Sequence, residues 1–165
     1  MKEKIKKDFS ATLPEQIGPA NLQWRPSVTG DAPALASLCS ASLNSQSFAE
    51  DCTPEELQKA LSSPDMLATV GGWHREELTV HASLYNRGCT DSACELSLEV
   101  TVSPAWQIPS VNLYLQQWFL TATENLSLKY FFGVRLKIYT LLPESGLWVR
   151  ALVTQLKFKA GHLFY

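Results

Sequence analysis

The sequence lacks the features that mark membrane-spanning and nucleic-acid-binding proteins. It contains no run of about 18 apolar residues, so no spanning helix and no membrane partner are expected. The 14 Lys and Arg residues are outnumbered by 16 Asp and Glu residues, and the net charge of -2 provides no basic surface for nucleic acid. The basic cluster at residues 2–7 is not followed by an apolar segment, so no export signal is expected.

Cysteine is also scarce and is not arranged as in metal sites. None of the four cysteines is in a C-x-x-C pair, and no pair of histidines lies near any of them, so no metal site is expected. We therefore expect reduced, scattered thiols and a cytoplasmic protein. The four residues are Cys39, Cys52, Cys89 and Cys94.

What the sequence does contain is enough apolar material for one folded domain. The chain has 165 residues, of which 45% are hydrophobic, including five Trp. This composition excludes a disordered chain and suits a single core. We expect a flexible lead-in at 1–21 and one domain at 22–165.

Periodicity predicts strands and helices in mixed order. The order β-α-α-β-β-β-α-β-α-β indicates an α/β (α+β) fold with a mixed sheet. The second helix has a strong start signal, because Thr53 and Glu56 form a capping box around Pro54. The expected strands are 22–26, 66–73, 78–85, 94–102, 135–142 and the start of one at 161–165; the expected helices are 29–43, 53–63, about 109–130 and 143–156.

Two strictly alternating segments, 78–85 and 94–102, predict an antiparallel pair joined by a loop over 86–93. If this pair closes around residue 90, His81 lies opposite Glu99 on its polar face. Such a pair could act as a general base, with Glu99 raising the pKa of the imidazole. The alternative is a solvated polar face with ordinary cross-strand partners.

Four local motifs, together with the element order, resemble the GNAT superfamily of N-acetyltransferases. "LQWRP" and "GDAPALASL" are similar to the family's first strand and helix, and "LEVTVSPAWQ" to its fourth strand and acyl-CoA turn. "LVTQLKF" is similar to the segment of its last helix. The resemblance covers residues 22–165 and implies a mixed, mostly antiparallel sheet flanked by helices, truncated before its last strand.

The acyl-CoA turn departs from the family's Q/R-x-x-G-x-G/A pattern. Gln107 is retained, but Ser110 and Asn112 replace the two small residues, and Pro109 has no N–H to donate to a phosphate. The Ser110 hydroxyl could also cap the following helix and occupy an amide. The resemblance implies that the pantetheine arm of acetyl-CoA is held by Val100, Thr101 and Val102, and its pyrophosphate by Gln107, Ile108, Ser110, Val111 and Asn112.

A second departure concerns the proton donor of the last helix. Many family members carry a Tyr four residues before a Gly-Phe pair, whereas here Val153 and Lys157-Phe158 stand at those places. A Val side chain cannot protonate a leaving thiolate.

The resemblance implies an acyl-CoA-dependent N-acetyltransferase that transfers acetyl from acetyl-CoA to a small-molecule or peptide amine, with Glu99 or His81 as the base. The alternative is a catalytically silent GNAT-like domain that supports a second GNAT domain, as one half of a tandem protein. A third interpretation is an α/β interaction domain without a CoA site. It requires that the strands at 94–102 and 135–142 do not splay apart.

Overall fold

The computed structural model describes residues 22–43, 53–129, 133–140, 148, 150–152 and 156. Five strands form one sheet in the order β1-β2-β3-β4-β5. Neighbouring strands are antiparallel except β4 and β5, which are parallel. The elements are β1 Gln23–Arg25, η2 Thr29–Asp31, α2 Ala32–Leu43, α3 Pro54–Ser62, β2 Met66–His74, β3 Glu77–Cys89, β4 Ala93–Val102, η3 Pro104–Trp106, α4 Pro109–Lys129 and β5 Arg135–Tyr139.

The predicted order of elements is confirmed from the first strand through β5. Of the helix expected at 143–156, residues 148 and 150–152 are described and helical, and residue 156 is described as a turn. The lead-in and the strand expected at 161–165 lie outside the described residues. No described helix is long and apolar enough to cross a membrane.

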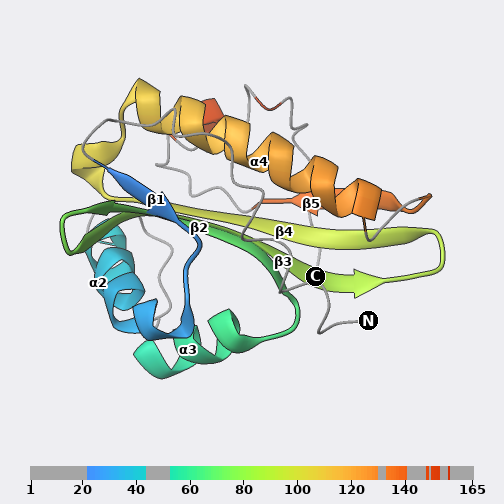
Figure 1. Ribbon diagram of the computed structural model, residues 1–165, viewed down its shortest axis with the longest axis horizontal. Coiled ribbons are helices and arrows are strands. Elements are labelled where there is room, and N and C mark those ends of the chain that lie inside the picture. The colour runs from blue at the N-terminus through green and yellow to red at the C-terminus, as the bar shows by residue number, and fades with distance from the viewer. Residues whose placement is uncertain are drawn as a thin grey trace.

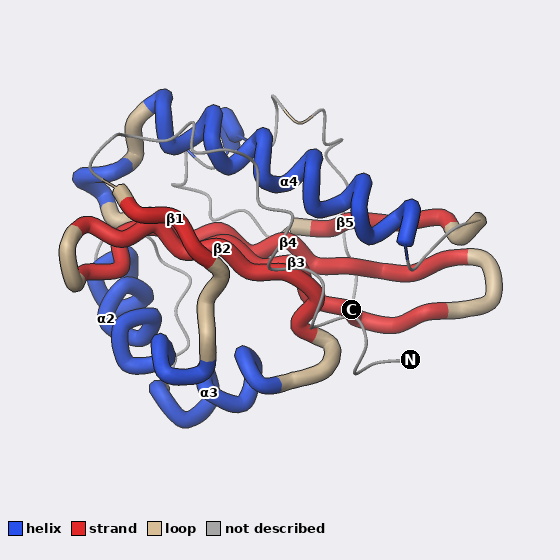
Figure 2. Tube along the Cα trace, in the orientation of Figure 1, coloured by secondary structure: helices blue, strands red, loops and turns tan. Residues whose placement is uncertain are grey.

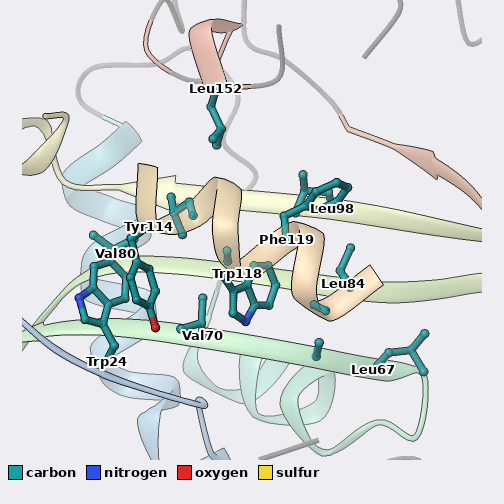
Figure 3. Packing of buried hydrophobic residues seen from close by; sticks show 14 of the residues in the cluster. Trp24, Leu67, Val70, Val80, Leu84, Leu98, Tyr114, Trp118, Phe119 and Leu152 are labelled. Atoms are coloured by element: carbon teal, nitrogen blue, oxygen red, sulfur yellow. The ribbon is translucent and has the colours of Figure 1, made fainter. Parts of the chain in front are cut away.

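The sheet is covered on both faces. Figure 1 shows α4 across one face and α2 and α3 below the other. Under α4, Trp24 of β1 stacks on Tyr114 with ring centroids 3.8 Å apart, and Trp118 and Phe119 follow along the helix (Figure 3). This face contains the larger apolar cluster, while α2 and α3 cover a smaller one formed by Ala32, Leu35, Leu38, Leu61, Met66 and Leu78.

The capping box predicted for the second helix is confirmed. The Thr53 side chain accepts a hydrogen bond from the Glu56 N–H, and the Glu56 carboxylate accepts one from the Thr53 N–H. Pro54 is the first residue of α3. These bonds satisfy amides that a helix start otherwise leaves without partners.

Strand β3 departs from the predicted alternation. Val80, Ala82 and Leu84 face α4 as expected, but Leu78 packs in the cluster under α2 and α3. The cause is a β-bulge, because Gly72 pairs with Val80 and Trp73 with Leu78, which leaves Thr79 as an extra residue.

The hairpin between β3 and β4 is longer than predicted. Residues 86–89, which we expected in the loop, continue β3, and Cys89 pairs with Cys94 in the ladder. These two cysteines form a disulfide, so the prediction of reduced thiols is wrong for them. The sequence did not reveal this pair because the longer hairpin is what places the two side chains opposite each other. The cytoplasmic location therefore loses this support and stays a prediction.

Candidate active site

The candidate site begins where β4 and β5 part. Parallel pairing runs from Ala93 with Arg135 to Ser97 with Tyr139, and β4 then continues to Val102 with no further partner on this side among the described residues. The β4–β5 pairing is described only as far as Tyr139, and residues 141–142 lie outside the described part of the chain, so the third interpretation, an interaction domain without a CoA site, is not tested.

Hydrogen bonds show which residues of β4 face the open edge. The Ser103 N–H donates to the Thr79 oxygen of β3 (2.8 Å), while the Ser92 oxygen accepts from Arg135 at the start of β5 (3.0 Å). Because backbone groups alternate along a strand, Val100 directs its N–H and C=O to the open edge and Thr101 directs its own to β3. Of the two, only Val100 therefore has its amide available there.

The corner that follows β4 is braced from inside. The Gln107 side chain donates to the Val102 oxygen at 3.4 Å, and the Ile108 N–H donates to the Trp106 oxygen at 2.9 Å. The amide of Ile108 is therefore already used, and Gln107 reaches back to β4. Neither arrangement was evident from the sequence, because both depend on how the η3 turn folds.

Helix α4 begins at Pro109, and this decides which amides are open. Pro109 has no N–H, and the Asn112 N–H donates to the Ile108 oxygen (3.2 Å) within the first turn. The amides of Ser110 and Val111 have no acceptor among the described residues. Two N–H groups at the positive end of a 21-residue helix can donate hydrogen bonds to an anion.

Two side chains of this turn differ from expectation. The Ser110 hydroxyl makes no capping bond among the described residues, because Ser110 lies inside the first turn and Ile108 precedes the helix. Asn112 is buried, and its Oδ1 accepts from the Gln116 side chain one turn later. Asn112 therefore contributes to the helix rather than to an open phosphate site.

An apolar crevice lies beside the open edge, between β4 and α4. It is too narrow to hold a water molecule. Leu98 and Val100 belong to both the crevice and the open part of β4, and Leu152 comes from the last described helical residues. The remaining lining residues are Ala82, Leu115, Trp118, Phe119 and Leu156.

The predicted pairing of His81 with Glu99 is wrong. His81 lies opposite Thr101, and Ser83 lies opposite Glu99, because the hairpin closes one residue later than assumed. The Glu99 side chain is 65% exposed and its Oε1 accepts from Arg87 Nη2 at 3.3 Å.

His81 is not on a solvated face. It alternates with Val80 and Ala82, which face α4, so its side chain points to the α2 face, where it is 6% exposed. Burial lowers the pKa of His81 to about 4, against a weaker opposite effect of the Asp31 charge. Its Nε2 has no hydrogen-bond partner among the described residues. His81 is therefore a neutral, buried imidazole at neutral pH.

The ion pair of Asp31 with Arg25 is a feature that sequence reasoning missed. The Asp31 carboxylate accepts two bonds from Arg25 (2.7 and 2.8 Å) and one from the Val28 N–H (2.8 Å). The bond from Arg25 is the main reason why the pKa of Asp31 is lowered. Arg25 also lies over the Trp73 ring, 4.5 Å from its centroid. The residues were visible in the sequence, but nothing in their spacing indicated the pair.

No group of three or more His, Cys, Asp or Glu that could hold a metal occurs within the described ranges. The arrangement offers an extended backbone edge, two anion-binding amides and an exposed carboxylate on one end of the sheet.

No protein-family model and no curated protein sequence matches the chain. Solved structures do match. A GCN5-related N-acetyltransferase from Sphaerobacter thermophilus aligns with 84% of this chain at 20% identity and a TM-score of 0.65. The aligned part is 43% of the Sphaerobacter chain, so this chain spans less than half the length of that neighbour.

Two further structures match over nearly their full length. A predicted acetyltransferase from Clostridium acetobutylicum, in complex with acetyl-CoA, aligns over 87% of this chain and 94% of its own, at 10% identity and a TM-score of 0.65. The ribosomal-protein-alanine N-acetyltransferase from Brucella melitensis aligns over 87% and 96%, at 11% identity and a TM-score of 0.61. This chain therefore has the fold of the GNAT N-acetyltransferases.

Proposed function

We propose that the chain is an acyl-CoA-dependent N-acetyltransferase that transfers acetyl from acetyl-CoA to an amine. The end of the described β4–β5 pairing at Ser97 carries this proposal, because it leaves the Val100 backbone without a partner among the described residues, on the strand that leads to the start of α4. An extended amide-rich chain can pair with such a strand edge, as a peptide does. The pantetheine arm of acetyl-CoA has this chemistry, and its pyrophosphate would lie at the Ser110 and Val111 amides.

Glu99 is the better of the two predicted bases. Its carboxylate lies on the last open stretch of β4 and is largely exposed, whereas His81 is enclosed under α2. Glu99 takes a proton from the amine, directly or through a water molecule. The nitrogen then attacks the thioester carbonyl, the C–N bond forms, and the C–S bond breaks. Val153 stands at the position where the family carries its Tyr, and a Val side chain has no proton to donate. The leaving sulfur therefore takes its proton from solvent. Val153 itself lies outside the described residues.

The alternative, a silent GNAT-like domain that supports a second one, also has structural support. Pro109 and the engaged Asn112 amide leave fewer donors than a glycine-rich turn supplies, and the crevice beside β4 has no room for water. The Sphaerobacter neighbour is more than twice as long as the part that this chain matches. A second GNAT domain would be the partner in this case.

We place the proposed reaction in the cytoplasm. Thiols are kept reduced there. The Cys89–Cys94 disulfide is unusual for this compartment and argues against the location. Thiol counting on protein isolated under alkylating conditions tests this location together with the disulfide.

Calorimetric titration with acetyl-CoA tests the proposal. The wild type should bind saturably and more weakly at higher salt, because the contact includes phosphate charge. Ser110→Glu should abolish binding by placing a carboxylate at the two open amides. Gln117→Glu adds the same charge to an exposed position two turns further along α4 and should bind like the wild type.

If folded wild type fails to bind at millimolar acetyl-CoA, the transferase proposal is wrong and the silent-domain alternative holds. Binding that survives Ser110→Glu would move the phosphate site away from α4. Saturable binding lost only in Ser110→Glu would justify assays with amine acceptors.

A further inference from the structure

A further β-bulge lies in the half of the hairpin where β4 is paired with β5, at Arg87. Asn86 pairs with Leu96 and Gly88 with Glu95, so Arg87 is an extra residue of β3. Gly88 has a φ of 153°, in the region that favours glycine, and its N–H donates to Asn86 Oδ1 at 3.0 Å. Bulges redirect a side chain and are frequent beside active sites.

The bulge places the Arg87 side chain against three neighbours. Its Nε donates to Ser97 Oγ at 3.0 Å, and its guanidinium lies 4.8 Å from the centroid of the Tyr85 ring. The Tyr85 hydroxyl is itself 3.2 Å from Ser63 Oγ, which orients the ring. Nη2 also donates to Glu99 Oε1 at 3.3 Å. The guanidinium is therefore fixed in position although the side chain is 53% exposed.

The Arg87 guanidinium has hydrogen-bond donors to spare. It carries five N–H groups, and only Nε and Nη2 have partners in the described part of the chain. Its planar fork suits a carboxylate, which it can hold through two parallel bonds. The 3.3 Å contact with Glu99 is long for a charge-assisted bond, so a ligand can replace it at little cost.

This cluster borders the end of α3, because the Tyr85 hydroxyl lies 3.2 Å from Oγ of Ser63, the residue that ends this helix. Figures 1 and 2 show α2 and α3 beneath one part of the sheet, with the hairpin end of β3 and β4 extending past them. Glu95 and Glu99 are both exposed on β4 here. The surface therefore presents one positive fork directly beside negative carboxylates, next to the strand that parts from β5.

We propose that Arg87 is a specificity-determining residue, which binds the carboxylate of a free α-amino acid while Glu99 receives its amine. The inference rests on the proposed transferase function. An α-amino acid carries its ammonium and its carboxylate on one carbon, which matches a guanidinium and a carboxylate in contact. A polycation is repelled by the positive charge of Arg87. An amine without a nearby carboxylate does not pair with the guanidinium of Arg87.

The reaction remains that of amide formation. The ammonium loses one proton to Glu99, and the neutral nitrogen attacks the thioester carbonyl. The C–N bond forms, the C–S bond breaks, and the nitrogen releases its second proton to solvent. The leaving thiolate takes a proton from solvent and departs as the CoA thiol. The carboxylate on Arg87 takes no part in bond making, so Arg87 acts on the choice of acceptor.

Ligand-observed NMR on the full chain, with and without CoA, tests the inference without requiring turnover. The probes are a mixture of L-amino acids, the corresponding L-amino acid amides, and spermidine. The amino acids should bind and the amides should not, since the amides lack only the carboxylate. Arg87→Gln should weaken binding of the acids by about tenfold to a hundredfold, as expected for loss of a charge-assisted contact.

Two further variants control this result. Arg135→Gln removes an exposed arginine at the far, paired end of β5 and should bind like the wild type. Arg87→Lys keeps the charge but not the fork and should be intermediate, which also covers the case in which Arg87→Gln does not fold.

The inference is overturned if amides or spermidine bind as well as the acids, if no probe binds, or if both Arg87 variants bind like the wild type. Loss of CoA binding with retained, Arg87-dependent amino-acid binding would reject the transferase proposal and keep the amino-acid site. CoA binding with no preference for amino acids would keep the transferase proposal and reject the amino-acid site.

Discussion

The two faces of the sheet are built differently. The face under α4 is mainly apolar, with Trp118 and Tyr114 1% exposed over Val70, Val80 and Leu84 (Figure 3). The face under α2 also buries polar residues, namely Asp31, Thr69, Thr79, His81 and Ser83. Burial of apolar surface stabilises a fold, while buried polar groups are costly unless they are paired. We conclude that the α4 face contributes most of the apolar burial that stabilises the domain. The opposite face contains the buried ionisable groups Asp31 and His81, whose pKa values are lowered in the fold.

The largest effect is expected from Trp118→Ala. The ring is 1% exposed at the centre of the α4 face, so its loss leaves a cavity and should cost about 3–5 kcal/mol of unfolding free energy. Urea denaturation measures this. Leu120→Ala, at a position that is 55% exposed on the same helix, should change stability little. Similar costs for the two variants would mean that α4 does not pack as described.

The second effect is a dependence of stability on pH, which comes from His81 on the α2 face. Burial lowers the pKa of His81 to about 4 from its ordinary value of 6.5. Between these two pH values the imidazole of His81 is therefore neutral in the folded chain and protonated in the unfolded chain. Its contribution to stability is therefore complete above pH 6.5 and is lost as the pH falls toward 4. The whole difference corresponds to roughly 3 kcal/mol.

Unfolding curves between pH 7 and pH 4 check this for His81. His81→Gln should flatten the decline, whereas Ser83→Ala, a buried neighbour on the same strand that does not titrate, should keep it. A wild type with constant stability over this range would show that His81 is not enclosed.

A smaller effect is expected from Asp31→Asn. Loss of the charged pair with Arg25 should cost about 1.5–3 kcal/mol at neutral pH, toward the lower end because Arg25 is 45% exposed. The pKa of Asp31 is lowered in the fold, so this stability exists above the unfolded value and is lost as the pH falls through the folded one. Thermal unfolding of variant and wild type should therefore converge in strong acid. A constant difference would assign the cost to packing.

The smallest effect tests the close approach of β1 to β2. A Cβ on Gly72 would lie 2.9 Å from the Trp24 ring, which is stacked on Tyr114 and cannot easily move. Gly72→Ala should therefore cost about 1–3 kcal/mol. Gly30→Ala, where a Cβ meets nothing within 4 Å, is the matched control. Calorimetric melting temperatures compare the two, and equal values would contradict the described packing of Trp24.

Much of the fold was predictable because local patterns agree with it. In α4, five apolar residues recur at helical spacing and are at most 2% exposed, so their spacing alone marks the buried side of the helix: Val111, Tyr114, Leu115, Trp118 and Ala122. The capping box of α3 was predictable for the same reason, because its bonds join residues three apart. The missing amide of Pro109 also follows from residue chemistry alone.

The candidate site was less predictable, because it depends on register. One extra residue at Thr79 moves Leu78 to the other face, and another at Arg87 brings a guanidinium to Ser97 and Glu99. A displaced hairpin closure separates His81 from Glu99. Alternation along a strand indicates which residues share a face, but it does not say which residues stand opposite.

The sequence by itself thus determined the order of elements, the apolar stripe of α4 and the composition of the turn that precedes it. Only the tertiary structure decided that β4 leaves β5 after Ser97, that the amides of Ser110 and Val111 are open, and that Cys89 meets Cys94. The physical reason is range. Propensity, capping and periodicity act within a few residues, whereas strand pairing, burial and bulges join segments far apart in the chain, and their free energies depend on contacts that no local pattern contains.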